Sequence, residues 1–337
     1  MRKNIIFITV FLFSVNLFSF TLDKVLEIGN EENEKYTFFS IGDITADEDG
    51  NIYVFDNKGY VLRKYNRRGK FLGQTGKKGK GPGDFSSPSS LSYYGNRIFV
   101  FDQGNNRIAV YDKKLRLISY INSKNFPLLG SQSFFVFGKR IYLKSPLSSK
   151  GGRISILDFK GKLIKQFFDR YPSYLEAWKE VKDYKKRIFL SIYSSPIFAF
   201  NREKKEIAIM FFYPESEMKI FLYDSSGKFI NTHTTYLIKG FKVPDCMKTL
   251  SPMKCLDKEK YSIGSLAFSR DYLFISYFKF VKGKKRGIPF FAIYNIKDRK
   301  IIKNKKGIFY ILYHTSKNKL YVSNEDNDKV MVLKIEG

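Results

Sequence analysis

The sequence is poor in the residues that most often hold metal ions or carry out catalysis. Its 337 residues include two histidines (His233 and His314), two cysteines and one tryptophan. A site built from three histidines is therefore excluded, and no further Cys or His lies near the cysteines to complete a four-ligand zinc site. No nucleophile-elbow motif occurs. We therefore expect neither a metal site built from His and Cys nor a bound cofactor. We favour the interpretation that the protein is not an enzyme.

The two cysteines, Cys246 and Cys255, stand nine positions apart in a segment that also contains two prolines. In an oxidising compartment such a pair can close a small loop through a disulfide. Two free thiols are the alternative, so the choice depends on where the protein resides.

Two apparent ligand-binding motifs fail on inspection. The glycine-rich stretch 76–83 has Pro82 after Gly81, where a phosphate-binding loop needs Lys and Ser or Thr. The acidic stretch 324–328 is followed by Lys329 and Ile335 at the positions where a calcium-binding EF-hand needs Gly and Glu. We interpret the first as a linker, and neither motif predicts a ligand.

Long apolar runs are also missing, except at the N terminus. Arg2 and Lys3 precede a largely apolar run from Ile5 to Phe18, and Ser19 follows it. About 14 residues span about 21 Å as a helix, which is shorter than the ~30 Å hydrocarbon core of a bilayer. The pattern predicts a signal peptide over 1–19 and a mature chain without a transmembrane span, exported to the periplasm, the cell surface or the medium. An uncleaved N-terminal anchor is the alternative.

Acidic residues are scarce relative to basic ones, since 60 Lys and Arg against 32 Asp and Glu give a formal charge of +28. Such a charge attracts nucleic acid, anionic lipid or acidic glycans. The lysines are scattered over turns and strand faces, however, so a solvated basic surface without a polyanion partner is the favoured interpretation.

What the sequence does contain is a repeated unit. An aromatic residue or Leu precedes Asp or Asn, a tight turn follows, and then come Lys or Arg and an apolar run; the copies begin at Tyr65, Tyr111, Leu157, Tyr223 and Tyr294. Two further apolar runs precede each copy. Four strands per unit, repeated about every 40–50 residues, are typical of a β-propeller. We predict an all-β, six-bladed propeller with four-stranded antiparallel blades, forming one domain over 20–337 with insertions at 169–187 and 232–262.

The last unit lacks its fourth strand, because the chain ends after the run 330–335. The segment 24–29 resembles 70–75, the outer strand of the first unit. We therefore expect the N-terminal strand to complete the last blade and close the ring, which removes an exposed sheet edge. We expect a monomer.

Residues 76–88 followed by 101–112 resemble the NHL-repeat family of six-bladed β-propellers. The resemblance is carried by Gly81-Pro82-Gly83-Asp84-Phe85 and by Asp102, Asn105 and Arg107, and blade 6 keeps Asn324 and 327–330. Blades 3 to 5 have drifted from this pattern. The resemblance implies a closed propeller that usually serves as a binding platform, with a minority of enzymes among its relatives.

The long connections all fall on one predicted face of the propeller, and they are 76–88, 145–152, 169–187, 213–218, 232–262 and 279–289. Loops elaborated on one side of a rigid scaffold build a binding surface, although neutral drift of loop length would also produce them. Candidate ligand-binding residues on this face are basic residues at an equivalent third-strand position, basic residues on loops, and one aromatic residue: Arg107, Arg153, Lys219, Lys329, Lys284, Arg286 and Trp178. Structural hydrogen bonds by Arg107, and a helix anchored by Trp178, are the alternatives.

We therefore predict an exported, non-enzymatic binding or scaffold propeller that uses this face to bind a protein, a peptide or a glycan, with an anionic ligand favoured. A hydrolase or lactonase with calcium in the central channel is the alternative, because ligands scattered over blades leave no linear motif. RNA binding is a second alternative, and the signal peptide argues against a nucleic-acid partner.

Overall fold

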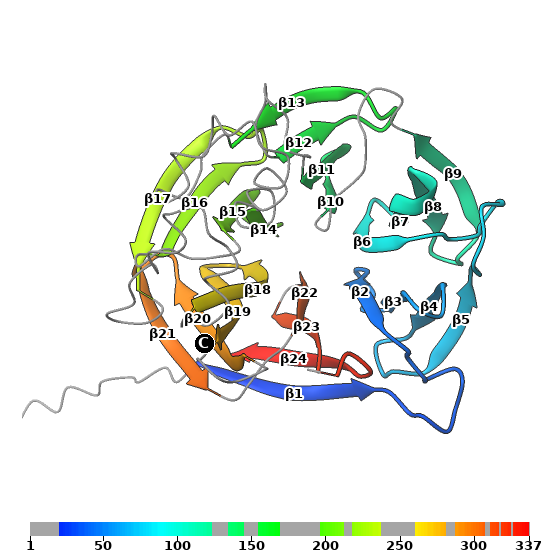
Figure 1. The fold of residues 1–337 in the computed structure, drawn as a ribbon, viewed down its shortest axis with the longest axis horizontal. Coiled ribbons are helices and arrows are strands. Elements are labelled where there is room, and N and C mark those ends of the chain that lie inside the picture. Colours follow the sequence, from blue (N-terminus) through cyan, green and yellow to red (C-terminus); the bar gives the residue numbers. More distant parts are fainter. Residues whose placement is uncertain are drawn as a thin grey trace, which may run out of the picture.

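The computed structural model describes residues 20–122, 134–144, 154–168, 196–211, 218–236, 260–280, 287–306, 311–316, 318–324 and 326–336. These residues form 24 strands and one short 3-10 helix, η1 (Gln103–Asn105). The strands make six antiparallel sheets of four strands, arranged as blades around a common axis (Figure 1). The predicted all-β six-bladed propeller is confirmed.

Each blade runs from an inner strand beside the axis to an outer strand on the rim. The first three blades, in order from inner to outer strand, contain β2 (Ile41–Ala46), β3 (Ile52–Asp56), β4 (Val61–Tyr65) and β5 (Phe71–Thr75); β6 (Pro88–Tyr94), β7 (Arg97–Asp102), β8 (Arg107–Asp112) and β9 (Leu117–Asn122); β10 (Phe134–Phe137), β11 (Arg140–Lys144), β12 (Ile154–Leu157) and β13 (Leu163–Phe167).

The other three blades follow the same order. They contain β14 (Pro196–Asn201), β15 (Glu206–Phe211), β16 (Met218–Asp224) and β17 (Phe229–Thr235); β18 (Lys260–Ser269), β19 (Tyr272–Phe280), β20 (Ile288–Asn295) and β21 (Lys300–Lys306); β22 (Ile311–Ser316), β23 (Lys319–Ser323), β24 (Val330–Glu336) and β1 (Thr21–Ile28).

The two ends of the chain meet in blade 6. The N-terminal strand β1 pairs antiparallel with β24, from Thr21 opposite Glu336 to Ile28 opposite Val330, and the two strands lie side by side at the edge of the ring (Figure 1). The predicted closure of the last blade by the N-terminal strand is confirmed.

The repeated sequence unit is the turn from the third to the fourth strand of a blade. In blade 1 the side chain of Asn66 accepts hydrogen bonds from the backbone N–H groups of Arg68 and Lys70, and Gly69 has a φ of +80°. Asp112, Asp158 and Asp224 accept the corresponding pairs of bonds in blades 2 to 4. The Asx side chain thus satisfies backbone donors inside the turn, which is the physical reason for its recurrence.

The core is divided into six apolar clusters, and each of them fills the space between two neighbouring blades. Blades 1 and 2, for example, enclose Tyr53, Phe55, Phe85 and Tyr111, all of which are at most 2% exposed. Large aromatic side chains suit these wedge-shaped spaces, because the sheets diverge toward the rim. The abundance of Phe and Tyr in the sequence follows from this packing.

Several predicted features lie outside the described residues, namely the signal peptide over 1–19, the insertion 169–187 with its expected helix, and the cysteine pair. The described ends of the insertion 232–262 belong to β17 and β18, so the connection is shorter than the sequence suggested. Among the helical residues that the structure describes, none forms a segment long and apolar enough to cross a membrane.

Candidate functional site

The two faces of the propeller differ in the length of their connections. On one face, first to second and third to fourth strands are joined by short turns, such as 95–96 between β6 and β7 and 66–70 between β4 and β5. The other face carries the connections from second to third strand and from one blade to the next, including 76–87 and the longer segments 168–195 and 236–259. We call these the short-turn face and the loop-bearing face.

A cavity of about 780 Å³ lies on the axis and is lined by the inner strands of all six blades. Because each inner strand follows a blade-to-blade connection, it begins at the loop-bearing face and ends at the short-turn face. The position of a residue along its strand therefore gives its depth in the cavity. The volume is within the range of about 300–1,000 Å³ that is typical of small-molecule sites.

The wall formed by blades 3 and 4 is aromatic. Phe135 of β10 stacks on Phe200 of β14, with ring centroids 4.2 Å apart, and packs edge to face on Phe198, with centroids 5.8 Å apart. All three residues line the cavity. This wall offers apolar ring surface to a ligand.

The wall formed by blades 1 and 2 is polar and centres on Asp43. Its carboxylate accepts hydrogen bonds from the hydroxyl of Ser90 (2.7 Å) and from the backbone N–H groups of Leu91 and Ile44. Burial is the main cause that raises the pKa of Asp43 to about 7, and the three hydrogen bonds oppose it. Asp43 thus ties blade 1 to blade 2 and changes its charge near neutral pH.

Three buried oxygen atoms of the same wall accept or donate no hydrogen bond within the described part of the chain, namely Thr45 Oγ1, Asn57 Oδ1 and Ser89 Oγ. Buried polar atoms normally have partners. These three oxygens are covered by neighbouring protein atoms, so a guest molecule in the cavity reaches them only if the wall rearranges.

The short-turn end of the cavity carries a cation. Arg202 follows β14 directly, lines the cavity, and donates from Nη2 to the carbonyl oxygen of Tyr93 at the end of β6, 2.8 Å away. It therefore reaches from blade 4 to blade 2. Burial lowers the pKa of Arg202 to about 10, so its charge is retained at neutral pH.

His314 of β22 also lines this cavity. Burial is the first cause that lowers its pKa to about 3, and the nearby positive charge of Arg202 acts in the same direction. The imidazole is therefore neutral at physiological pH, and its ring packs against that of Tyr321 with centroids 5.6 Å apart. Arg202 is the positive group of this end of the cavity.

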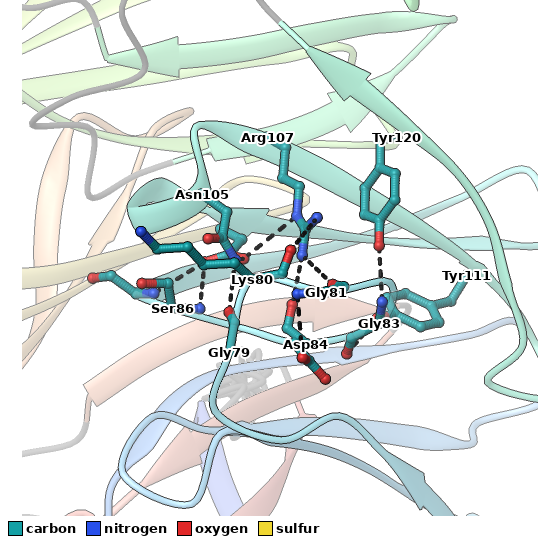
Figure 2. A network of polar contacts seen from close by, with 12 residues as sticks. Gly79, Lys80, Gly81, Gly83, Asp84, Ser86, Asn105, Arg107, Tyr111 and Tyr120 are labelled. Atoms are coloured by element: carbon teal, nitrogen blue, oxygen red, sulfur yellow. Dashed lines mark hydrogen bonds and ion pairs between the residues drawn. The ribbon is translucent and has the colours of Figure 1, made fainter.

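Arg107 is held in a network on the loop-bearing face. Its guanidinium donates to the backbone carbonyls of Gly81 (3.0 Å) and Asp84 (2.8 Å), lies 3.7 Å from the carboxylate of Asp102, and covers the ring of Tyr120 at 4.2 Å (Figure 2). These bonds fasten the 76–87 connection to blade 2. Arg107 therefore makes the structural hydrogen bonds that the sequence analysis named as its alternative role. Ligand binding by Arg107 stays a prediction.

The other candidates divide into two groups. Lys219 in β16 and Lys329 before β24 lie at the loop-bearing ends of third strands, as predicted from their position in the repeat. Lys329 is exposed and pairs with Glu27 of β1, with Nζ and Oε1 3.7 Å apart. The rest lie outside the described residues: Arg153, Trp178, Lys284, Arg286, Cys246 and Cys255.

The described lining does not fit a channel calcium ion. It contains one carboxylate, Asp43, whose oxygens are already hydrogen-bonded, whereas calcium takes about six to eight oxygen ligands, several of them charged. Across the part of the chain that is described, no group of three or more His, Cys, Asp or Glu side chains could hold a metal.

Sequence reasoning did not find Asp43, Arg202 or the aromatic wall. Arg202 belongs to a charged turn that resembles many others in a chain with 60 basic residues, and Asp43 is a single acidic residue within β2. The one available signal was an Asp inside an apolar inner-strand run, which breaks the alternation expected of a buried strand.

The fold and the cavity define a six-bladed β-propeller. A family model described as a 6-bladed beta-propeller, DUF5128, matches residues 19–171. No curated protein sequence matches the chain.

Solved structures resemble the chain over nearly its whole length. A member of the DUF4221 family from Bacteroides vulgatus has a TM-score of 0.65 at 12% identity, covering 95% of this chain and 98% of that chain. A protein from Bacteroides fragilis described as exported has a TM-score of 0.63 at 13% identity, covering 94% of each. Hydrazine synthase from Kuenenia stuttgartiensis has a TM-score of 0.52 at 11% identity, covering 91% of this chain and 80% of that chain. At these identities the likeness shows the fold alone.

Proposed function

We propose that this protein is an exported binding propeller that takes a protein, peptide or glycan partner on its loop-bearing face. The observation that carries the proposal is the placement of every long connection on the face where the inner strands begin. A rigid ring of six sheets holds these loops in fixed relative positions, which is what a binding surface needs. We also favour non-enzymatic binding over calcium-dependent hydrolysis, because the described lining contributes one carboxylate, Asp43, and calcium needs several charged oxygen ligands.

Export is supported by two observations. The sequence begins with a basic residue pair and an apolar run that is too short to span a bilayer. The similar protein from Bacteroides fragilis is described as exported. The relation to NHL-repeat propellers is part of the same proposal and is supported by the hydrogen bonds of Asp102, Asn105 and Arg107 to the preceding connection.

The test compares two triple charge-reversal variants of the full chain in capture of partners from an envelope extract. Lys58, Lys77 and Lys80 are exposed on the loop-bearing face, and Lys114, Lys160 and Lys228 are exposed on the short-turn face. Each set is changed to Glu, so the two variants carry the same net charge. We expect the first variant to lose the captured partner and the second to retain it. Equal capture by both, or loss by the second alone, contradicts the proposal.

A further inference from the structure

Arg202 presents an incompletely paired positive charge to the cavity. A guanidinium carries five N–H donors, and the described residues supply one hydrogen-bond acceptor to it, the carbonyl of Tyr93. Within the described part of the chain, no carboxylate forms an ion pair with it. The charge of Glu48 acts on it from a distance, but that carboxylate accepts a hydrogen bond from the hydroxyl of Tyr93.

A partly buried cation with free donors is costly unless an acceptor reaches it. The lowered pKa of Arg202 reports this cost, because burial disfavours its charged form. A carboxylate that enters the cavity can offer two oxygen acceptors in the planar geometry that a guanidinium matches. An acidic group is therefore the guest that this end of the cavity stabilises most.

The surroundings of Arg202 decide what else the guest must contain. His314 is neutral and adds a hydrogen-bonding ring without competing charge. Phe200 of β14 lies two residues before Arg202, which follows the strand, and belongs to the aromatic wall with Phe135. An apolar body attached to the acidic group would therefore lie against phenyl rings.

We propose that the axial cavity is a binding site for a small organic acid, with its carboxylate on Arg202 and its aryl or alkyl body against Phe135, Phe198 and Phe200. This inference is independent of partner binding on the loop-bearing face, because it depends on residues at the opposite end of the cavity. The cavity volume of about 780 Å³ accommodates a guest of this kind.

The test is isothermal titration calorimetry of the full-length protein at pH 6 with 3-phenylpropionate, octanoate and the neutral amide 3-phenylpropionamide. The acid and the amide have nearly the same shape, so their difference measures the charge interaction. We expect 3-phenylpropionate to bind roughly tenfold to a hundredfold more tightly than the amide.

Arg202→Met keeps much of the side-chain volume and removes the charge. We expect this variant to bind the acid and the amide with equal affinity. Its affinity for the amide should equal that of the unchanged protein. Arg97→Met is the matched control, since Arg97 is the exposed first residue of β7 at the short-turn face, and it should preserve the preference for the acid. If Arg202→Met does not fold, Arg202→Lys replaces it and is expected to keep the charge preference at reduced affinity.

Equal binding of acid and amide by the unchanged protein overturns the inference, as does an acid preference that survives in Arg202→Met. Failure of both acids to bind overturns it as well. None of these outcomes bears on the charge-reversal variants of the loop-bearing face, so the two proposals fail separately.

Discussion

The hydroxyl of Tyr313 on β22 donates to the carbonyl oxygen of Ile41 on β2, 3.0 Å away, across the boundary between blade 6 and blade 1. Burial raises the pKa of Tyr313, so its hydroxyl keeps its proton and remains a donor throughout the physiological range. The backbone N–H of Ile41 donates in turn to the carbonyl of Asn327, at 3.0 Å. The boundary where the ring closes is therefore tied by hydrogen bonds as well as by the pairing of β1 with β24.

Removing β1 should destabilise the whole ring. A chain that begins at residue 31 loses every β1–β24 pair and the contributions of Leu22, Leu26 and Ile28 to two apolar clusters. We expect the free energy of unfolding to fall by on the order of 5 kcal/mol and the melting temperature by roughly 10 °C or more, relative to a chain that begins at residue 20. Equal melting temperatures by circular dichroism would show that β1 is dispensable.

Asp43 should make stability depend on pH. Its folded-state pKa of about 7 lies above the ordinary 3.8, so the folded protein holds this proton more tightly than the unfolded chain does. Its stabilising contribution is complete below about pH 4 and is lost as pH rises through 7. We expect Asp43→Asn to gain stability relative to the unchanged protein between pH 5 and 8, by on the order of 2–4 kcal/mol.

The measurement is urea unfolding of both chains at several pH values. Taking the difference between the chains cancels the effect of His314, whose lowered pKa acts in the opposite direction and removes stability as pH falls below about 6.5. Parallel stability curves for the two chains would mean that Asp43 has an ordinary pKa.

Arg107 should control the order of the 76–87 connection. Arg107→Leu removes the donor to the carbonyls of Gly81 and Asp84, and we expect a loss of about 1–3 kcal/mol with faster hydrogen exchange at the N–H of Phe85, which bonds to Lys77. Arg116→Leu is the control, because Arg116 is exposed and pairs with Asp112 at the surface; its cost should be below about 1 kcal/mol. Unchanged exchange in Arg107→Leu would show that the connection holds without this clamp.

Arg299 occupies a turn position that glycine fills in other blades. Its φ is +55°, whereas Gly69, Gly161 and Gly227 take this conformation in blades 1, 3 and 4. A side chain in the left-handed region costs about 1–2 kcal/mol, so Arg299→Gly should stabilise the protein by about 0.5–1 kcal/mol and raise its melting temperature by about 2 °C. Lys300→Gly, within β21, should do the opposite. A lower melting temperature for Arg299→Gly would refute strain at this turn.

Much of the fold could be read from local pattern. The Asx turn needs an acceptor side chain, a residue that tolerates positive φ and a strand on each side. The signals for all three occur within six consecutive residues, as in Tyr65–Lys70. Five copies of this unit, with one further set of apolar runs that lacks it, predicted six blades, and the unmatched segment 24–29 predicted the closing pair with 330–335.

The candidate site was harder to predict from the sequence because its residues are far apart in the chain. Asp43, Phe135 and Arg202 come from three blades, and no spacing connects them. Their environments are set by burial, which only the assembled ring creates. Conversely, Arg107 was conspicuous in sequence, and the structure shows its donors bound to the backbone of the adjacent connection.

The amino-acid sequence by itself determined the strands, the turns, the number of blades and the segment that closes them, because these depend on contacts between residues near in the chain and on one complementary pair of ends. Tertiary structure alone decided the chemistry of the axial cavity. Bringing six inner strands to a common axis removes water from Asp43, His314 and Arg202 and shifts the pKa of each, whereas in the extended chain all three would titrate normally.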